Sequence, residues 1–236
     1  MVEFKIYGRI PDGYSSQGTA YGSNSRIYQD IVDELKQKEE SIEEVHLALY
    51  LFNNMHLLDE LTKLKNRGIK IVVISLPLTG YDKRKIEAAW DVYSAVFRSE
   101  LELLVYPHMY MWYGAEYAGG GASYSFHVKS GIIKYKDGEA KAFLTSGNLA
   151  PGDPTHSETA LFIKSELHSQ FIKPFELFFT EVEQRAKLYK EYSQQVSGLS
   201  KQLQQVFDFS FVGNLNPVNY SSNEVAHAFF TSPFIY

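Results

Sequence analysis

The chain has 236 residues, a length that suits one large α/β domain with a substantial buried core. It contains no cysteine, which excludes disulfide bonds and thiolate metal sites and makes a cytoplasmic location the default expectation. The formal net charge of −5 argues against a protein that coats nucleic acid and against stable membrane association, since both usually need basic surfaces, but it permits a local basic cleft.

The first half of the chain alternates between predicted strands and predicted helices. We expect strands at residues 2–10, 45–52, 69–76 and 101–106, of which the second is continuously apolar, as a strand buried on both faces is. Helices are expected at 25–40, 57–65 and 82–99, where apolar residues recur at helical spacing. This alternation predicts an α/β fold with a mixed, mostly parallel central sheet and helices on both faces.

Residues 107–125 are rich in glycine and aromatic side chains and are too numerous for a simple connection. We interpret this segment as a functional loop. Its aromatic rings could stack on nucleic-acid bases or line a lipid groove, and packing against a partner subunit is an equal alternative. The candidate substrate-binding residues are Tyr110, Trp112, Tyr113 and Tyr124.

The second half continues with a predicted β-hairpin, whose strands at 126–135 and 140–146 are joined by the turn-forming dipeptide Asp137-Gly138. A further strand is expected at 159–163, and a mostly helical pattern follows at 166–203. Little periodicity remains after that.

The hairpin register predicts a cluster of polar side chains. If Asp137-Gly138 is a two-residue loop, Lys129 lies opposite Ser146. The same register sets His127 opposite Asn148, and the two-residue period of a strand brings all four side chains to one face. An imidazole, an ammonium, a hydroxyl and an amide in such an array suit the binding of an oxyanion.

These residues resemble the motif of the phospholipase D superfamily, which reads His-x-Lys, four residues, Asp, about six residues, and Gly-Ser-x-Asn. The chain offers His127-Val128-Lys129 and Thr145-Ser146-Gly147-Asn148, and Glu158 stands where the family places an acidic residue about ten positions past the Asn. Two positions depart from the motif, because Lys134 replaces the Asp and Thr145 replaces the first Gly. The Asp is structural in the family. Its replacement by Lys134 therefore argues against a close relationship to the family more than against phosphodiesterase activity.

The resemblance implies a two-step displacement at phosphorus that needs no metal ion or other cofactor. His127 would attack and form a phosphohistidine, and a second His would protonate the leaving oxygen. Lys129 and Asn148, assisted by Ser146, would hold the non-bridging oxygens. Glu158 would orient an imidazole by accepting a hydrogen bond from its ring.

That mechanism needs two His-x-Lys units, and the chain has one. A homodimer would supply the second by bringing two copies of the hairpin around one phosphate. The rival is a two-lobed protein that has been cut short. We therefore expect residues 1–206 to form a phospholipase D-like domain and residues 207–236 to form a C-terminal arm or the start of a missing second lobe.

The leading functional hypothesis is an endonuclease that cleaves phosphodiester bonds of DNA or RNA. One alternative is a phospholipid hydrolase or phosphatidyl transferase, and another is a catalytically silent nucleic-acid-binding member of the same fold. A metal site of His and carboxylate ligands is a further possibility, weaker because scattered loop histidines are more often solvated. Its ligands would be His108, His127, Asp153 and His156.

Overall fold

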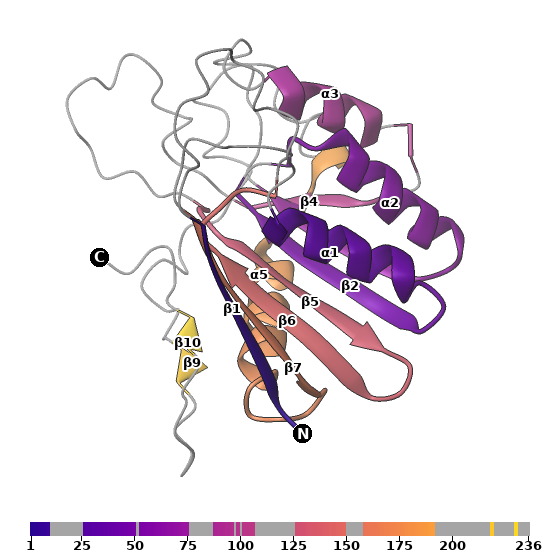
Figure 1. Ribbon diagram of the computed structural model, residues 1–236. Helices are drawn as coiled ribbons and strands as arrows, with labels where there is room; N and C mark the ends of the chain where they lie inside the picture. The colour runs from indigo at the N-terminus through magenta and orange to yellow at the C-terminus, as the bar shows by residue number, and fades with distance from the viewer. Residues whose placement is uncertain are drawn as a thin grey trace, which may run out of the picture.

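An eight-stranded sheet forms the centre of the molecule, with the strand order β1-β7-β6-β5-β2-β3-β4-β8 (Figure 1). The computed structural model describes residues 1–9, 26–50, 52–75, 87–96, 98–99, 101–106, 126–149, 158–191, 218–219 and 229–230. The strands of the sheet are β1 (Glu3–Arg9), β2 (Ile42–Leu49), β3 (Lys70–Ser75), β4 (Leu103–Val105), β5 (Lys129–Tyr135), β6 (Glu139–Thr145), β7 (Glu158–Glu166) and β8 (Lys187–Leu188). The described helices are α1 (Arg26–Gln37), α2 (Met55–Asn66), α3 (Glu87–Val96) and α5 (Lys173–Arg185).

The sheet is mixed, as expected, but its strands are not mostly parallel. Two pairings, β2 with β3 and β3 with β4, are parallel and come from two successive βαβ units. The other five pairings of the described sheet are antiparallel. The second half of the chain contributes two of these pairs, because β5, β6 and β7 are neighbours both along the chain and across the sheet, and each runs opposite to the one before it.

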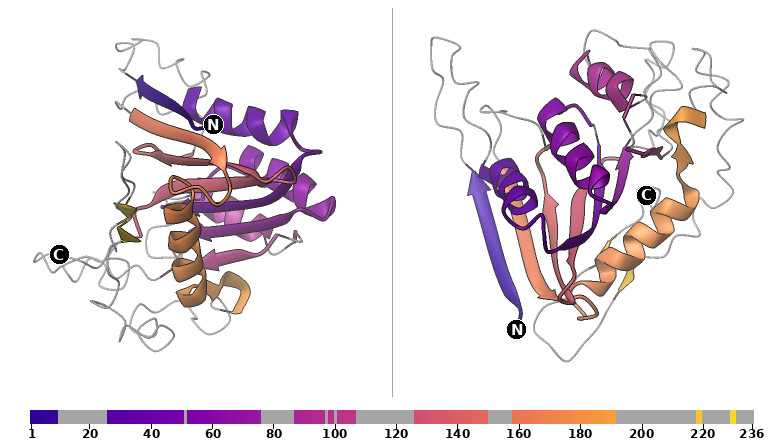
Figure 2. Two further views of the ribbon diagram at one scale, coloured as in Figure 1. Left: turned by 90° about the horizontal axis from the view of Figure 1, so that it is seen from below. Right: turned by 90° about the vertical axis from the view of Figure 1, so that its right-hand side faces the viewer.

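Helices cover both faces of the sheet, as the sequence predicts. One core joins α1, α2 and α3 to side chains such as Leu47, Ile133 and Phe143, whereas a second core joins α5 to Ile132 and Ile163. Figure 2 shows α5 on the opposite side of the sheet from α1 and α2. The alternation of Ile132 and Ile133 between the two cores follows from the two-residue period of a strand.

The region predicted as mostly helical, residues 166–203, is described as far as residue 191, and this part contains helix α5 and an additional strand. Helix α5 has Pro174 in its first turn and ends before Ala186, whose backbone is extended at φ −71° and ψ 158°. A proline suits the first turn because the amide hydrogen it lacks has no helical acceptor there. Strand β8 follows and pairs with the edge of β4. With two residues, β8 is too short to produce a periodic signal in the sequence.

The C-terminal arm is described only at the short strands β9 (Val218–Asn219) and β10 (Phe229–Phe230), which pair with each other and contact α5. The boundary predicted at residues 206 and 207 lies outside the described residues, so the division into domain and arm stays a prediction. Among the described helices, none is long and apolar enough to cross a bilayer.

Candidate active site

His127 and Lys129 lie where β5 begins beside the end of β2. Lys129 is the first residue of β5, and its backbone pairs with Leu49, the last residue of β2. His127 precedes the strand by two residues and is exposed, while Lys129 is buried with 5% of its surface accessible. An accessible imidazole therefore lies beside a buried ammonium group at one end of the sheet.

The two side chains are in direct contact. Lys129 Nζ lies 3.0 Å from Nε2 and 3.2 Å from Nδ1 of the His127 ring, and it donates to the His127 carbonyl oxygen at 3.2 Å. An ammonium group has only donors, so it can approach a ring nitrogen closely when that nitrogen keeps its lone pair. This contact joins the first two predicted site residues and favours the neutral imidazole.

Partial burial, and then the positive charge of Lys129, hold the pKa of His127 below its ordinary value. Both causes act in the same direction, because burial and a neighbouring cation each disfavour the protonated ring. An unperturbed imidazole has a pKa of ~6.5 and is already mostly neutral at pH 7. The environment of His127 extends that neutral, nucleophilic form to lower pH.

Tyr50 is a third member of the site that the sequence reasoning missed. Its ring contacts the His127 ring edge to face, with centroids 4.5 Å apart and an angle of 61° between the planes. Lys129 Nζ lies 5.1 Å from the Tyr50 ring centroid, within the range of a cation–π interaction. Its position immediately after a buried strand was the available signal, because binding residues often follow the carboxyl ends of strands in α/β sheets.

The predicted hairpin register is wrong by one residue. The observed pairs include Ser130 with Leu144 and Lys134 with Ala140, so the loop has three residues rather than two. The third is Gly138, which has φ +84° and donates from its amide to the Tyr135 carbonyl oxygen. A tight turn followed by a left-handed glycine adds one residue to the loop, and that shift changes which residues face each other.

Ser146 therefore does not pair with Lys129 as expected. Continued beyond Ser130 and Leu144, the observed register sets Lys129 opposite Thr145. Ser146 instead bridges to β7: its amide donates to the Thr159 carbonyl oxygen, and its Oγ accepts from the Thr159 amide, both at 2.9 Å. These two bonds hold the end of β6 against the start of β7.

Thr145, which replaces a motif glycine, starts the bend in which the remaining motif residues lie. Its Oγ1 accepts from the Gly147 amide at 3.1 Å, a hydroxyl turn that takes the chain out of the β5–β6 ladder. Asn148 follows and is exposed. Glu158 opens β7, and its backbone pairs with Arg9 at the end of β1. The motif residues other than Lys134 therefore lie at one end of the sheet.

Asn54, also missed by the sequence reasoning, fixes the backbone next to Asn148. Its Nδ2 donates to the Leu149 carbonyl oxygen at 3.0 Å, while its Oδ1 accepts from the Leu57 amide at 3.1 Å. The second bond caps the N-terminus of α2. Asn54 is 2% exposed and Leu149 is 3% exposed, so the link is made away from solvent. An asparagine ahead of an apolar helical pattern is a recognisable cap, but its partner at Leu149 is visible only in the fold.

Lys134, which replaces the motif aspartate, lies on the face of the sheet covered by α5. Its Nζ is 3.3 Å from Glu44 Oε2 on β2 and 3.2 Å from Glu176 Oε1 on α5. His46, buried beside this pair, contacts Glu183 at 2.6 Å and Glu44 at 2.9 Å. The substituted position thus joins α5 to the sheet through ion pairs, and it takes no part in the contacts around His127.

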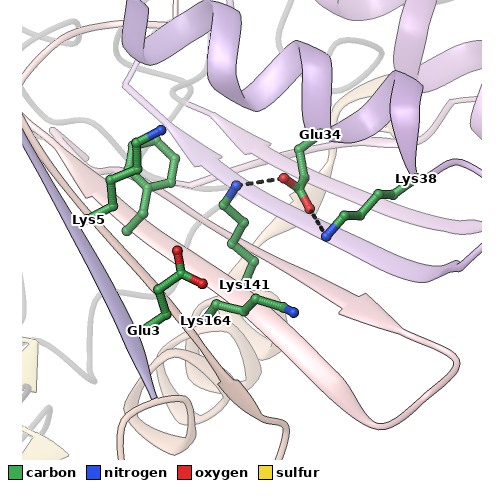
Figure 3. Close-up of a pocket in the computed structure, with 7 residues that line it drawn as sticks. Glu3, Lys5, Glu34, Lys38, Lys141 and Lys164 are labelled. Carbon is green, nitrogen blue, oxygen red and sulfur yellow. Dashed lines mark hydrogen bonds and ion pairs between the residues drawn. The ribbon is translucent and has the colours of Figure 1, made fainter. Parts of the chain in front are cut away.

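A pocket of about 220 Å³ lies between α1 and strands β1, β6 and β7 (Figure 3). His127 is not among the residues that line it. Its lining residues are Glu3, Lys5, Glu34, Lys38, Lys141, Phe162 and Lys164. Each lysine has a carboxylate partner: Lys5 pairs with Asp30, Lys38 and Lys141 with Glu34, and Lys164 with Glu139. Lys141 also precedes Thr145 by four positions, roughly 13 Å along a strand. Because its lysines are neutralised by carboxylates and it lies far from Thr145 and the other motif residues at the end of β6, this pocket is poorly suited to bind a phosphate group.

The predicted aromatic residues Tyr110, Trp112, Tyr113 and Tyr124 lie outside the described residues. So do three of the four residues considered as metal ligands, His108, Asp153 and His156. Within the part of the chain that the structure describes, no group of three or more His, Asp or Glu side chains is placed to hold a metal ion.

No protein-family model matches the sequence, and no curated protein matches it either. Solved structures do match. NucT from Helicobacter pylori has a TM-score of 0.52 at 13% sequence identity, with 79% of this chain and 98% of that chain covered. A phospholipase D family member, Nuc from Salmonella typhimurium, has a TM-score of 0.49 at 15% identity, with 80% and 99% covered. Yeast tyrosyl-DNA phosphodiesterase has 0.34 at 14%, with 69% and 32% covered. At these identities the likeness concerns the fold alone, and of these three only NucT exceeds 0.5.

Proposed function

We propose that this chain is a phosphodiesterase of the phospholipase D superfamily that acts without a metal ion through a phosphohistidine on His127. Its fold is similar to that of NucT, and its His-x-Lys and Ser-x-Asn residues resemble the motif of that superfamily. The observation that supports this most directly is the contact between the accessible imidazole and the buried ammonium of Lys129. The nucleophile must be neutral to attack, and the lowered pKa of His127 provides that form at neutral pH.

The proposed reaction has two displacements at phosphorus. In the first, a neutral ring nitrogen of His127 forms a bond to phosphorus, the bond from phosphorus to the leaving oxygen breaks, and a second imidazole gives that oxygen a proton. In the second, water attacks phosphorus, its proton passes to the second imidazole, and the bond between phosphorus and His127 breaks. Lys129 and Asn148, with Ser146 assisting, bind the non-bridging oxygens, and Glu158 orients an imidazole.

The second imidazole comes from His127 of another copy of the chain. A single His-x-Lys unit in the sequence supports this arrangement, as does the exposure of His127 at one end of the sheet. A two-fold axis through the bound phosphate would make the interface isologous and give the two copies of His127 equivalent positions. Either copy could then act as the nucleophile.

We propose a nucleic acid, DNA or RNA, as the substrate class. The aromatic side chains of residues 107–125 are suited to stack on bases of a single strand. Plasmid nicking and liposome headgroup release, both measured in chelator, separate this substrate from a phospholipid. Faster headgroup release than nicking would refute the nucleic-acid assignment while leaving the proposed chemistry intact.

The chemistry itself is tested with His127→Ala and His127→Asn. Both variants remove the nucleophile from an exposed position, so the fold should tolerate them. We expect the phosphodiesterase rate measured in chelator to fall by about 10³-fold or more, as it does when a covalent nucleophile is removed. A catalytically silent protein would show no such activity in the wild type, and an unchanged rate in both variants would exclude His127 as the nucleophile.

Subunit mixing tests the shared site. Wild-type protein and His127→Ala are combined in equal amounts and allowed to exchange subunits fully before the assay. If the two copies of His127 act on one phosphate, only wild-type homodimers react, and about a quarter of the activity of an all-wild-type sample remains. Retention of about half would mean that each chain works alone, because mixed dimers would keep one active copy.

A further inference from the structure

We propose that Tyr50 and Asn54, the first and last residues of the connection between β2 and α2, position two parts of the site relative to each other. One part is the start of β5 with His127 and Lys129, and the other is the segment after β6 with Asn148. The inference rests on the proposed function, because it assigns roles to residues around His127 and Asn148. Tyr50 contacts the part that begins β5, and Asn54 contacts the part that follows β6. One short connection thereby touches both.

Tyr50 restrains His127 and Lys129 through its ring. The ring meets the imidazole with its centroid at 4.5 Å and the ammonium at 5.1 Å, while the ammonium lies 3.0 Å from the imidazole. The three groups thus contact one another pairwise. A ring on one side of His127 also limits its access to water, which agrees with the lowered pKa of this residue.

Asn54 restrains Asn148 through the backbone. The Leu149 carbonyl oxygen, one residue beyond Asn148, accepts the hydrogen bond from Asn54 Nδ2. Asn54 is itself fixed, because its Oδ1 accepts from the amide of Leu57 in the first turn of α2. The backbone next to the exposed Asn148 is therefore hydrogen-bonded, through Asn54, to the first turn of α2.

Both contacts matter for rate because a misplacement of about 1 Å can cost on the order of 10²-fold in catalysis. Tyr50 and Asn54 are positioning residues and not catalytic residues, since they act on the orientation of other side chains. Their loss should lower kcat more than it raises KM, because the correct arrangement is needed mainly in the transition state.

The Tyr50 contact is tested with Tyr50→Phe and Tyr50→Leu, assayed with bis(4-nitrophenyl) phosphate in chelator. We expect Tyr50→Phe, which keeps the ring, to stay within about 3-fold of the wild-type kcat, and Tyr50→Leu to lose 10-fold or more. A titration of His127 by NMR gives a readout independent of turnover. The pKa of His127 should rise in Tyr50→Leu and stay unchanged in Tyr50→Phe.

Tyr135→Leu is the matched control. It removes a buried ring from the far end of β5, where Tyr135 Oη donates to Glu34, so it lowers stability without touching His127. An unchanged titration of His127 in Tyr50→Leu would overturn the positional role of Tyr50. The same titration shift in Tyr135→Leu would also overturn it, because the effect would then reflect general destabilisation.

The Asn54 contact is tested with Asn54→Ser and Asn54→Ala. Serine caps a helix about as well as asparagine but is too short to reach Leu149, whereas alanine loses both bonds. We expect both variants to lose 10-fold or more in kcat, and only Asn54→Ala to lose the helix cap as well. Wild-type kcat in Asn54→Ser would limit Asn54 to its capping role and refute the proposal.

These experiments distinguish failure of the positioning proposal from failure of the proposed function. If His127→Ala and Asn54→Ser both retain full activity, the chemistry does not use this site. If His127→Ala is inactive while Tyr50→Leu and Asn54→Ser match the wild type, the proposed function stands and the positioning proposal is wrong.

Discussion

Gly131 on β5 leaves room for the side chains of Leu47 on β2 and Phe143 on β6, which pack against its backbone. Any residue with a Cβ atom would collide with them. A Cβ atom at this position would lie 2.4 Å and 2.5 Å from two ring atoms of Phe143 and 2.7 Å from a methyl group of Leu47. Ordinary contacts begin at 3.4 Å, so Gly131→Ala requires the ring to move by about 1 Å. Phe143 is 1% exposed, and its ring centroid lies 5.7 Å from that of Phe162, which leaves little room for the shift.

We expect Gly131→Ala to lower the free energy of unfolding by roughly 2 kcal/mol. Overpacking of a close-packed core costs up to ~3 kcal/mol, and replacing a strand glycine by alanine recovers about 0.5–1 kcal/mol of backbone entropy. The loss is measured by urea unfolding followed by circular dichroism. Because Gly131 follows Lys129 by two residues on β5, displacement of the strand should also reduce phosphodiesterase activity.

A double-mutant cycle tests the cause of this loss. Phe143→Leu removes the ring, so Gly131→Ala should cost less in that background, with a coupling of about 1 kcal/mol or more. Gly138→Ala is the control, since Gly138 has a left-handed backbone and open space around it. It should cost about 1 kcal/mol in either background. Additive effects of Gly131→Ala and Phe143→Leu, or a Gly131→Ala variant as stable as the wild type, would refute the steric account.

Two further predictions concern charges within the fold. Burial opposes ionisation of Glu34, but hydrogen bonds from Lys141, Tyr135 and Lys38 outweigh it and lower its pKa to about 2. Since an unfolded Glu has a pKa of ~4.3, the stability contributed by Glu34 is complete above that pH and is lost as the pH falls towards 2. In urea unfolding the difference between wild type and Glu34→Gln should therefore shrink on acidification from pH 6 to pH 3, and a constant difference would contradict it. Lys134→Asp restores the motif residue yet adds a carboxylate beside Glu44 and Glu176, so it should cost about 2–3 kcal/mol and more than Lys134→Met does. A Lys134→Asp variant as stable as the wild type would show that these ion pairs do not hold α5.

The sequence predicts elements well where apolar patterns are long and local. The stretches around Leu47, Leu61 and Ile74 are strand, helix and strand as expected, because periodicity and burial act together there. The hairpin register fails because the identity of a turn depends on the backbone conformation of one residue, Gly138, and the dipeptide Asp-Gly suits both two-residue and three-residue loops. Strand β8 has too few residues to give a pattern.

In the candidate site, too, local contacts are predictable from the sequence and contacts across the fold are not. The contact between His127 and Lys129 is predictable, because the two residues are neighbours in sequence and one of them begins a strand. Tyr50 and Asn54 reach the site across the fold, from positions 77 and 95 residues away from His127 and Leu149, and no local sequence pattern predicts such contacts. Lys134 shows the converse, since its partners on β2 and α5 explain a motif departure that the sequence alone leaves open.

In the proposed mechanism, His127 becomes bonded to phosphorus during turnover. The most direct measurement is rapid denaturing quench of the wild-type protein during reaction with a phosphodiester in chelator, followed by mass spectrometry of peptides under alkaline conditions that preserve phosphohistidine. We predict a phosphoryl adduct on the peptide that contains His127, absent in His127→Asn and accumulating when release is slowed. Turnover with no adduct on that peptide under any quench time, or with an adduct on another residue, would contradict the mechanism.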